Sequence, residues 1–332
     1  MRLPHSTRRG ALALGLGLLV PQRRVRAADI MPGVMYAIGE KFDGSFNEGA
    51  FRGFETFRQR SGAEYLEYQP DSIADAERGI AALARRGATD ITAVGFYYAD
   101  PVTQLAPAYD AIRFNLIDAV AQGDNVRSIT FREQEGCFLT GILAAMASKS
   151  GKIGFIGAID IPLIRRFVAG YTAGAKHARS DVEVIVNFVG TTPAAFNDPT
   201  AAGELAKGQF GRGGDVVFAG AGNSNIGIFQ AAADAKRLAI GVDSNQNGLF
   251  PGTILTSMLK RVDVAVGQTL ADAQENRWEA GVLSLGLAED AVGWALDENN
   301  VDLITPEMRA AVDAATDDIL AGRITVPDGT TS

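Results

Sequence analysis

Residues 215–242 read DVVFAGAGNSNIGIFQAAADAKRLAIGV, and this stretch decides the fold. The apolar run at 215–219 predicts a strand, the glycine-bearing turn after it predicts a loop, and a helix is expected to start near Asn225. A second apolar strand follows at 238–242. Because two strands joined by a helix run parallel in one sheet, this unit predicts an α/β protein with helices on both faces of the sheet.

The same strand-and-helix unit recurs along the chain in two series. In the first, strands are predicted at 34–38, 65–68, 91–96, 114–117 and 128–131. In the second, strands are predicted at 152–156, 182–189, 215–219 and 238–242, with helices starting near Ile161, Pro199 and Asn225. The chain is then expected to cross back through a strand at 253–258, a helix at Val262–Gln274 and an extended segment at 281–287.

The length of the chain also favours two lobes. Its 332 residues exceed the size at which single cores stop growing, about 250 to 300 residues. No Pro/Ser-rich linker separates the two series, so several short crossovers are expected instead of one tether. We assign residues 1–27 to a signal peptide, 28–130 and 257–285 to an N-terminal lobe, and 131–256 and 286–332 to a C-terminal lobe. Between two such lobes, ligands bind at the carboxyl ends of the strands.

The first 27 residues predict a secretory signal. Basic residues precede the apolar run 11–20, and the small residues before position 28 predict cleavage after Ala27. The run is too short to span a bilayer, and the choice between the Sec and twin-arginine export routes stays open. Cleavage would remove six arginines and no acid, changing the net charge from −8 to −14. An acidic, soluble, exported protein is therefore expected.

Charge and the scarcity of cysteine and histidine argue against several functions. The negative charge, with no Lys/Arg cluster of more than two beyond residue 30, argues against nucleic acid as a partner. Cys137, the one cysteine, is expected to be a buried small hydrophobe, which leaves no disulfide and no cysteine near the cleavage site for a lipid anchor. His5 belongs to the signal and His177 is expected at an exposed helix end, so catalytic triads and histidine metal sites are poorly supported.

No cofactor and no metal are expected either. The turn at 220–225 carries Asn225 where a dinucleotide-binding loop needs its third glycine. The segment that starts at Asp243 imitates the first half of a calcium loop but has Ile254 where a bidentate glutamate is required.

The loop after the first strand is the first candidate for ligand contacts. Ser45 and Glu48 have the spacing of a capping box, which predicts that a helix begins here. Phe46 and Asn47 then lie in its first turn, at the expected cleft, where they suit a flat, hydrogen-bonding ligand. The alternative is that Phe46 belongs to the core and Asn47 merely caps the helix.

Three charged residues follow other strands. Asp118 and Asp243 come directly after apolar strands, so we expect both at the carboxyl edge of a sheet, where an acid can accept from a hydroxyl or ring N–H. Lys260 follows the crossover strand and is expected near the hinge. The alternatives are that Asp118 caps the next helix and that Lys260 is an exposed lysine without a structural role.

Five blocks of the sequence, in order from about residue 33 to Val326, resemble the basic membrane protein family. They are 44–53 (GSFNEGAFRG), 131–136 (FREQEG) with Gly141, 154–162 (GFIGAIDIP), 166–170 (RFVAG), and 240–246 (IGVDSNQ) with 259–263 (LKRVD). Members of that family are substrate-binding proteins of ABC importers, and the purine nucleoside receptors are its best understood branch.

The resemblance implies a type I periplasmic-binding-protein fold: two Rossmann-like lobes, joined by three hinge crossovers, that close on a ligand. In the nucleoside branch, aromatic side chains stack on the base while acids, Asn and a Lys hold base and ribose. Carried onto this sequence, it implies ligand-binding roles for Asp43, Phe46, Asn47, Asp118, Phe167, Gly222, Asp243 and Lys260.

The resemblance also implies a function: a protein that is not an enzyme, binds a nucleoside, with a purine nucleoside as first candidate, and delivers it to ABC permease subunits. Many relatives are lipoproteins, whereas this chain is expected to diffuse freely in a Gram-negative periplasm. Asn245, where many relatives have Asp, and the unusual Tyr97-Tyr98 pair leave the exact ligand open. The alternatives are a free nucleobase or another small polar molecule, for uptake or sensing, and a secreted nucleoside-cleaving enzyme.

Overall fold

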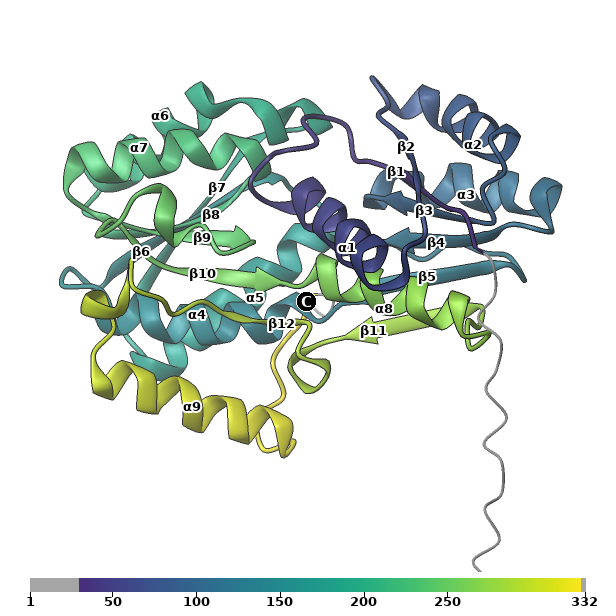
Figure 1. The fold of residues 1–332 in the computed structure, drawn as a ribbon. Coiled ribbons are helices and arrows are strands. Elements are labelled where there is room, and N and C mark those ends of the chain that lie inside the picture. Colours follow the sequence, from purple (N-terminus) through teal and green to yellow (C-terminus); the bar gives the residue numbers. More distant parts are fainter. Residues whose placement is uncertain (1–29, 330–332) are drawn as a thin grey trace, which may run out of the picture.

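The computed structural model describes residues 30–329, whose strands form two six-stranded sheets (Figure 1). In sheet A every neighbouring pair of strands is parallel. Its spatial order is β11 (Gly281–Leu285), β5 (Val126–Phe131), β4 (Arg113–Ile117), β3 (Asp90–Val94), β1 (Pro32–Met35) and β2 (Leu66–Tyr68).

Sheet B is parallel except at one edge, where β12 pairs antiparallel with β10. Its spatial order is β12 (Val292–Trp294), β10 (Ile254–Lys260), β9 (Leu238–Asp243), β8 (Val216–Gly220), β6 (Lys152–Ile159) and β7 (Glu183–Gly190). The predicted strands of both series are present with ends shifted by a few residues, and the predicted α/β class with two lobes is confirmed.

Helices cover both faces of each sheet (Figure 1). Buried side chains of α1 (Phe46–Ser61) and α8 (Val262–Gln274) pack on one face of sheet A, and those of α2 (Ala76–Arg85) and α3 (Ala99–Leu105) pack on the other. On sheet B, the corresponding layers are α4 (Glu133–Ala147), α5 (Pro162–Ala178) and α9 (Pro306–Leu320) against α6 (Pro199–Gly211) and α7 (Asn225–Ala235). Burial on both faces explains why most of these strands read as continuous apolar runs.

Three crossovers join the lobes, as predicted. They lie between β5 and α4, between β10 and α8, and between β11 and β12. The backbone N–H of Arg132 donates to the carbonyl of Leu285 (2.7 Å), and that of Arg261 donates to Ala291 (2.8 Å), so the three segments lie side by side. Arg132 also pairs with Glu289 on the third crossover (2.7 Å). Since β10 pairs with β9 and β12, residues 257–260 lie in sheet B, whereas the predicted N-terminal lobe includes them.

The α4–α5 pair is unusually close because glycines line its contact. A methyl group at Gly174 would lie 1.9 Å from the carbonyl oxygen of Phe138, and one at Gly141 would lie 2.2 Å from that of Tyr171. Any side chain at these positions would force the two helix backbones apart. This tight pair holds the start of α4 and the first turns of α5 beside the crossovers.

Two predictions about single residues are confirmed. Cys137 is buried in the core of the sheet B lobe, and this burial raises the pKa of its thiol. His177 is exposed at the end of α5. Between residues 30 and 329, none of the helices is both long and apolar enough to cross a bilayer. The predicted signal peptide lies outside the described residues.

Candidate functional site: a cavity between the two lobes

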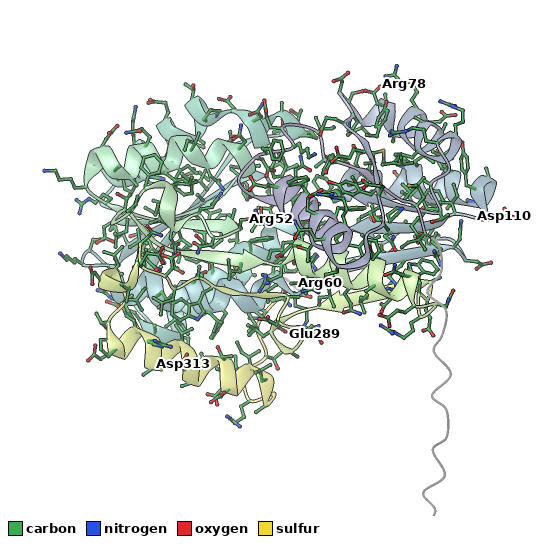
Figure 2. The ribbon with its side chains drawn as sticks, viewed as in Figure 1. Arg52, Arg60, Arg78, Asp110, Glu289 and Asp313 are labelled. Atoms are coloured by element: carbon green, nitrogen blue, oxygen red, sulfur yellow. The ribbon has the colours of Figure 1, made fainter. Side chains whose placement is uncertain are left out.

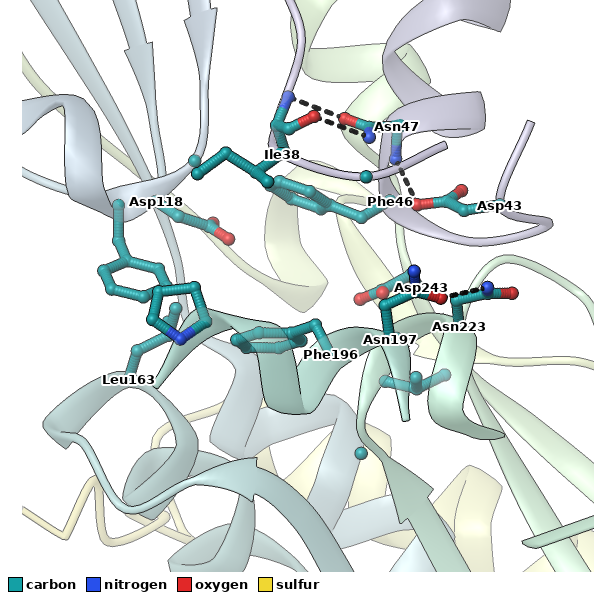
Figure 3. A pocket seen from close by; sticks show the side chains of 18 of the residues that line it. Ile38, Asp43, Phe46, Asn47, Asp118, Leu163, Phe196, Asn197, Asn223 and Asp243 are labelled. Carbon is teal, nitrogen blue, oxygen red and sulfur yellow. Dashed lines mark hydrogen bonds between the residues drawn. The ribbon is translucent and has the colours of Figure 1, made fainter. Parts of the chain in front are cut away.

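A cavity of about 300 Å³ lies between the lobes, at the carboxyl ends of strands from both sheets (Figure 3). The structure brings together around it all of the residues for which the family resemblance implies ligand contacts. These are Asp43, Phe46, Asn47, Asp118, Phe167, Gly222, Asp243 and Lys260. Their contact with a ligand stays a prediction, but their common location follows from the parallel topology.

The helix predicted after the first strand begins at Phe46, but the predicted capping box is wrong. The carboxylate of Asp43 accepts from the backbone N–H groups of Ser45 (2.8 Å), Asn47 (3.0 Å) and Glu48 (3.2 Å), so Asp43 caps α1. The positive end of the helix dipole stabilises the negative charge of this carboxylate. Burial raises the pKa of Asp43, while the three N–H groups act in the opposite direction.

Asn47 is committed to the backbone and does not cap the helix. Its side-chain oxygen accepts from the N–H of Ala37 (2.8 Å), and its side-chain nitrogen donates to the carbonyls of Ala37 (3.1 Å) and Glu40 (3.0 Å; Figure 3). These bonds fasten the segment after β1 to α1. Asn47 therefore shapes the wall of the cavity, and its two side-chain N–H groups are already used.

Aromatic rings form opposite walls of the cavity. Phe46 projects from the start of α1, and Phe196 projects from the turn Pro193–Asn197 on the other lobe; Figure 3 shows the two rings on opposite sides of the space. Both are only partly buried, so a ring face stays accessible. Phe96 and Phe167 also line the cavity, and Phe96 packs against buried residues of the sheet B lobe. Phe196 was not among the predicted residues.

Gly222 is the reason that Phe196 can lie where it does. Gly222 has a φ of 59°, in the left-handed region that favours glycine, and a methyl group there would lie 3.2 Å from the Phe196 ring. The neighbouring Asn223 donates its side-chain N–H to Asn197 (2.7 Å), so two carboxamides lie at this edge of the cavity (Figure 3).

Lys260 is buried, which rules out the alternative of an exposed lysine. Only 2% of its side chain is exposed, and its ammonium lies 2.6 Å from Asp118 and 3.2 Å from Glu133. The rings of Phe46, Phe131 and Phe167 enclose it, with centroids 5.1, 5.0 and 5.7 Å from Nζ. Burial alone lowers the pKa of Lys260, but the surrounding carboxylates outweigh burial and raise it, so the lysine is charged.

Asp118 and Asp243 share an unusual backbone conformation, with φ of 76° and 64°. Non-glycine residues in this left-handed region cost on the order of 1 kcal/mol and gather at functional sites. No helix follows Asp118 before β5, so the capping alternative is wrong. The second oxygen of Asp118 is buried and has no hydrogen-bond partner among residues 30–329. Asp243 accepts from the hydroxyl of Ser45 across the cleft (2.6 Å).

Glu133 is a second residue that sequence reasoning missed. It is the first residue of α4, its side chain is 1% exposed, and Lys260 and Arg166 lie 3.2 and 3.6 Å from its carboxylate. Burial raises its pKa, and Lys260 acts against this. The sequence pattern could have pointed to Glu133, because it is an acid two residues beyond the end of β5 and therefore lies at a strand end, like Asp118 and Asp243.

Two α/β lobes joined by three crossovers, with a cavity at the carboxyl ends of their strands, define the type I periplasmic-binding-protein fold. The chain belongs to the basic membrane protein family, since the family model described as an ABC transporter substrate-binding protein, PnrA-like, matches residues 31–329. This confirms the resemblance. The protein is a substrate-binding protein of the kind that serves ABC transporters.

Individual relatives agree with this assignment. The ABC transporter nucleoside-binding protein BmpA of Lactococcus lactis subsp. cremoris (strain MG1363) is 30% identical over 309 residues, which cover 86% of this chain and 85% of that protein. A crystal structure of an ABC transporter solute-binding protein from Aeropyrum pernix K1 has a TM-score of 0.81 and 30% identity, covering 90% of this chain and 94% of that one.

A third relative bears on the lipid anchor. An uncharacterized lipoprotein of Pyrococcus abyssi is 31% identical over 289 residues, 83% of this chain and 72% of that protein. In the present chain the one cysteine, Cys137, lies in the buried core. The expected lack of an anchor stays a prediction.

Proposed function

We propose that the protein binds a nucleoside, with a purine nucleoside as first candidate, in the cavity between its lobes and delivers it to an ABC permease from the periplasm. The observation that carries this proposal is the pairing of two facing aromatic rings with a group of carboxylates in one cavity of about 300 Å³. This volume lies in the range of small-molecule sites, about 300–1,000 Å³. The nucleoside-binding relative from Lactococcus lactis supports the same ligand class.

We infer that a flat base stacks between Phe46 and Phe196. Both rings face the cavity from opposite lobes, so a base stacked between them would be held only when the lobes are closed. Each base–aromatic stack contributes about 1–3 kcal/mol and tolerates different bases. Stacking therefore supplies affinity and couples it to closure, while the polar groups supply specificity.

The ribose suits the carboxylate of Asp243. A cis-diol presents two donors, which one carboxylate accepts together, and Asp243 lies at the cavity with only Ser45 as a hydrogen-bond donor among the described residues. The unpartnered oxygen of Asp118 accepts a further donor of the ligand.

The charge of the cavity favours a neutral ligand. Glu40, Asp43, Asp118 and Asp243 line it, with Lys260 as the one basic residue among its lining residues. A phosphate would meet several carboxylates at short range in a site of low dielectric, where like charges repel strongly. We therefore expect nucleosides to bind and the corresponding nucleotides to be rejected.

Polar contacts across the cleft hold the lobes together beside the cavity. The hydroxyl of Ser244 donates to the carbonyl of Ser45 (3.0 Å), and Arg52, which lies on α1 between the lobes in the view of Figure 2, donates to Ser244 (2.6 Å). The Gln246 amide donates to the carbonyl of Gly44 (3.2 Å). These bonds must break when a ligand enters or leaves, so they oppose release until the lobes open.

The test is a binding screen on the chain without residues 1–27. Inosine, guanosine, adenosine, cytidine and uridine are compared with hypoxanthine, ribose and inosine monophosphate by thermal shift and isothermal titration calorimetry. We expect at least one purine nucleoside to raise the melting temperature, and the monophosphate to have no effect. Binding of hypoxanthine alone would favour the nucleobase alternative, and no binding at all would overturn the proposal.

Two further experiments test the absence of catalysis and the location of the protein. Chromatography of the incubated nucleoside checks that no free base is released. Fractionation of cells that produce the full chain checks export.

Replacing Phe196 with alanine removes one wall of the stack. We expect nucleoside affinity to fall by about 2 kcal/mol, or roughly thirtyfold, because one aromatic face is lost. Titration calorimetry measures the change. Phe250→Ala serves as control, because this partly buried phenylalanine packs against α7 and does not line the cavity. Equal affinities of the wild type and Phe196→Ala would mean that the base does not stack here.

The pKa of Asp243 predicts that binding depends on pH. Burial raises this pKa from 3.8 to about 6, although Lys260 and the Ser45 hydroxyl lower it, while Asp118 and Asp43 add to the rise. Only the ionised carboxylate accepts both ribose hydroxyls. Nucleoside affinity should therefore fall about tenfold between pH 7 and pH 5.

The control for this pH dependence is Asp243→Asn, whose affinity should be weak and should lack this tenfold change. The raised pKa of Asp243 affects folding in the opposite direction: without ligand, a higher pH lowers the stability of the protein, whereas it strengthens nucleoside binding. The native state holds the Asp243 proton more tightly than the unfolded chain does, so this residue's contribution to stability falls as the pH rises from 3.8 to about 6. A wild-type affinity that is constant from pH 5 to pH 7 would contradict the role of this carboxylate.

A further inference from the structure

Glu133 is the most deeply buried carboxylate beside the cavity, yet it does not line it. Its side chain is 1% exposed, and neither of its oxygens accepts a hydrogen bond from a side chain of residues 30–329. Lys260 lies 3.2 Å from one oxygen and Arg166 lies 3.6 Å from the other. Burying an ionised carboxylate at such depth is costly, and pairing it with a cation only offsets that cost. The presence of Glu133 beside Lys260 therefore needs a reason.

The surroundings of the Lys260 ammonium supply that reason. Three phenyl rings enclose it, and water has little access, because the side chain is 2% exposed. Its three N–H groups must therefore find acceptors in the protein or on a ligand. Asp118 accepts a hydrogen bond from one of them (2.6 Å). The carboxylate of Glu133 is the second anionic group within 4 Å of the ammonium. The charge of Glu133 therefore helps to fix the position of the ammonium, and with it the direction of the two N–H groups that Asp118 does not accept.

The same contact joins the moving parts of the protein. Glu133 follows directly after the first crossover, Lys260 ends β10 directly before the second, and Asp118 directly follows β4 in the other lobe. Lys260 bridges the lobes by its bond to Asp118, while its contact with Glu133 anchors it at the hinge. Displacing the ammonium would also displace the Asp118 carboxylate, which lines the cavity and has one oxygen without a hydrogen-bond partner among residues 30–329.

We propose that Glu133 is a positioning residue of the binding site: from outside the cavity, it holds the Lys260 ammonium at the hinge and thereby orients Asp118 toward the ligand. This inference rests on the proposed nucleoside-binding function. The charged groups that face this carboxylate are Lys260 from β10, Asp118 from the end of β4 and Arg166 from α5. Without Glu133, the ammonium is drawn only toward Asp118 and Asp243, away from the hinge.

The test compares inosine binding by the wild type with that by Glu133→Gln, Glu133→Asp and Glu135→Gln. Glu135 is the matched control, because it lies in the same first turn of α4 but pairs with Arg132 (2.7 Å) instead of Lys260. We expect Glu133→Gln to raise the dissociation constant about tenfold or more, Glu133→Asp to recover part of the loss, and Glu135→Gln to change it less than about twofold.

A second readout does not need a ligand. The ¹⁵N NMR signal of the Lys260 ammonium, assigned by its disappearance in Lys260→Arg, should shift or broaden in Glu133→Gln and stay unchanged in Glu135→Gln. If the wild type binds inosine and Glu133→Gln binds it equally well, the inference fails while the proposed function stands. If the wild type binds no nucleoside, the proposed function fails, and an unchanged Lys260 signal in Glu133→Gln overturns the positioning role as well.

Discussion

Replacing Asp243 with alanine is expected to weaken nucleoside binding by about 3 kcal/mol or more, roughly a hundredfold, while binding of a free base changes little. The physical reason is that a charged acceptor for two ribose hydroxyls is lost, and each such bond contributes about 1.5–3 kcal/mol. A free base lacks the ribose and so does not use this carboxylate. Titration calorimetry with inosine and hypoxanthine on the same protein measures both effects.

Ser45→Ala separates this role of Asp243 from its role in closure. The Ser45 hydroxyl donates to Asp243 across the cleft (2.6 Å), so Asp243→Ala removes an interlobe bond as well as a ligand contact. Ser45→Ala removes only the interlobe bond and should weaken inosine and hypoxanthine alike, by about tenfold or less. An equal loss of both ligands in Asp243→Ala would assign this acid to the base or to lobe closure instead of the ribose.

Lys260→Met is expected to have the largest effect on stability. It leaves Asp118, Glu133 and Asp243 close together without their shared cation, and breaking a buried pair in this way costs about 3–5 kcal/mol. The free energy of unfolding at pH 7, from urea titration followed by circular dichroism, should fall by that amount. Lys152→Met is the control, because the pair of Lys152 with Glu183 is exposed (42% and 56%) and should contribute less than about 1 kcal/mol.

The loss in Lys260→Met should shrink as the pH is lowered. Burial raises the pKa values of Glu133 and Asp243, and Lys260 is the group that acts most strongly against that rise. Without it, the native state takes up protons more readily than the unfolded chain, so its relative stability increases as the pH falls through the range of these pKa values. An equally small effect of Lys260→Met and Lys152→Met at pH 7 would contradict the account of this cluster.

The α8 helix shows how far local sequence patterns carry. It was predicted and is found at Val262–Gln274. The acids Asp118 and Asp243 were predicted at the site for a topological reason, since all parallel strands of a sheet present their carboxyl ends at the same edge. Neither prediction needed knowledge of which segments pack together.

The residues that were missed or misjudged depend on partners far along the chain. Phe196 lies beyond the end of β7, on a turn held by the Ser224 hydroxyl, which donates to Ala195 (2.8 Å) and accepts from Asp198 (2.6 Å). Glu133 lies in the segment 131–136 that resembles the family, but its role depends on Lys260, which lies on another strand. Ser45 has the spacing of a capping residue, yet its hydroxyl bonds Asp243, 198 positions away.

The sequence by itself determined the order of the strands and helices up to β11, the parallel pairing of most strands and the kinds of residue at the strand ends, but β12 and α9 were not predicted. These features follow from short-range periodicity and from the few ways in which strand–helix units connect. Only the tertiary structure decided which side chain accepts from which donor, which ring faces which, and which charge is buried beside Lys260. Those outcomes depend on desolvation and on contacts between segments far apart in the chain, where several partners compete for each polar group and packing selects one.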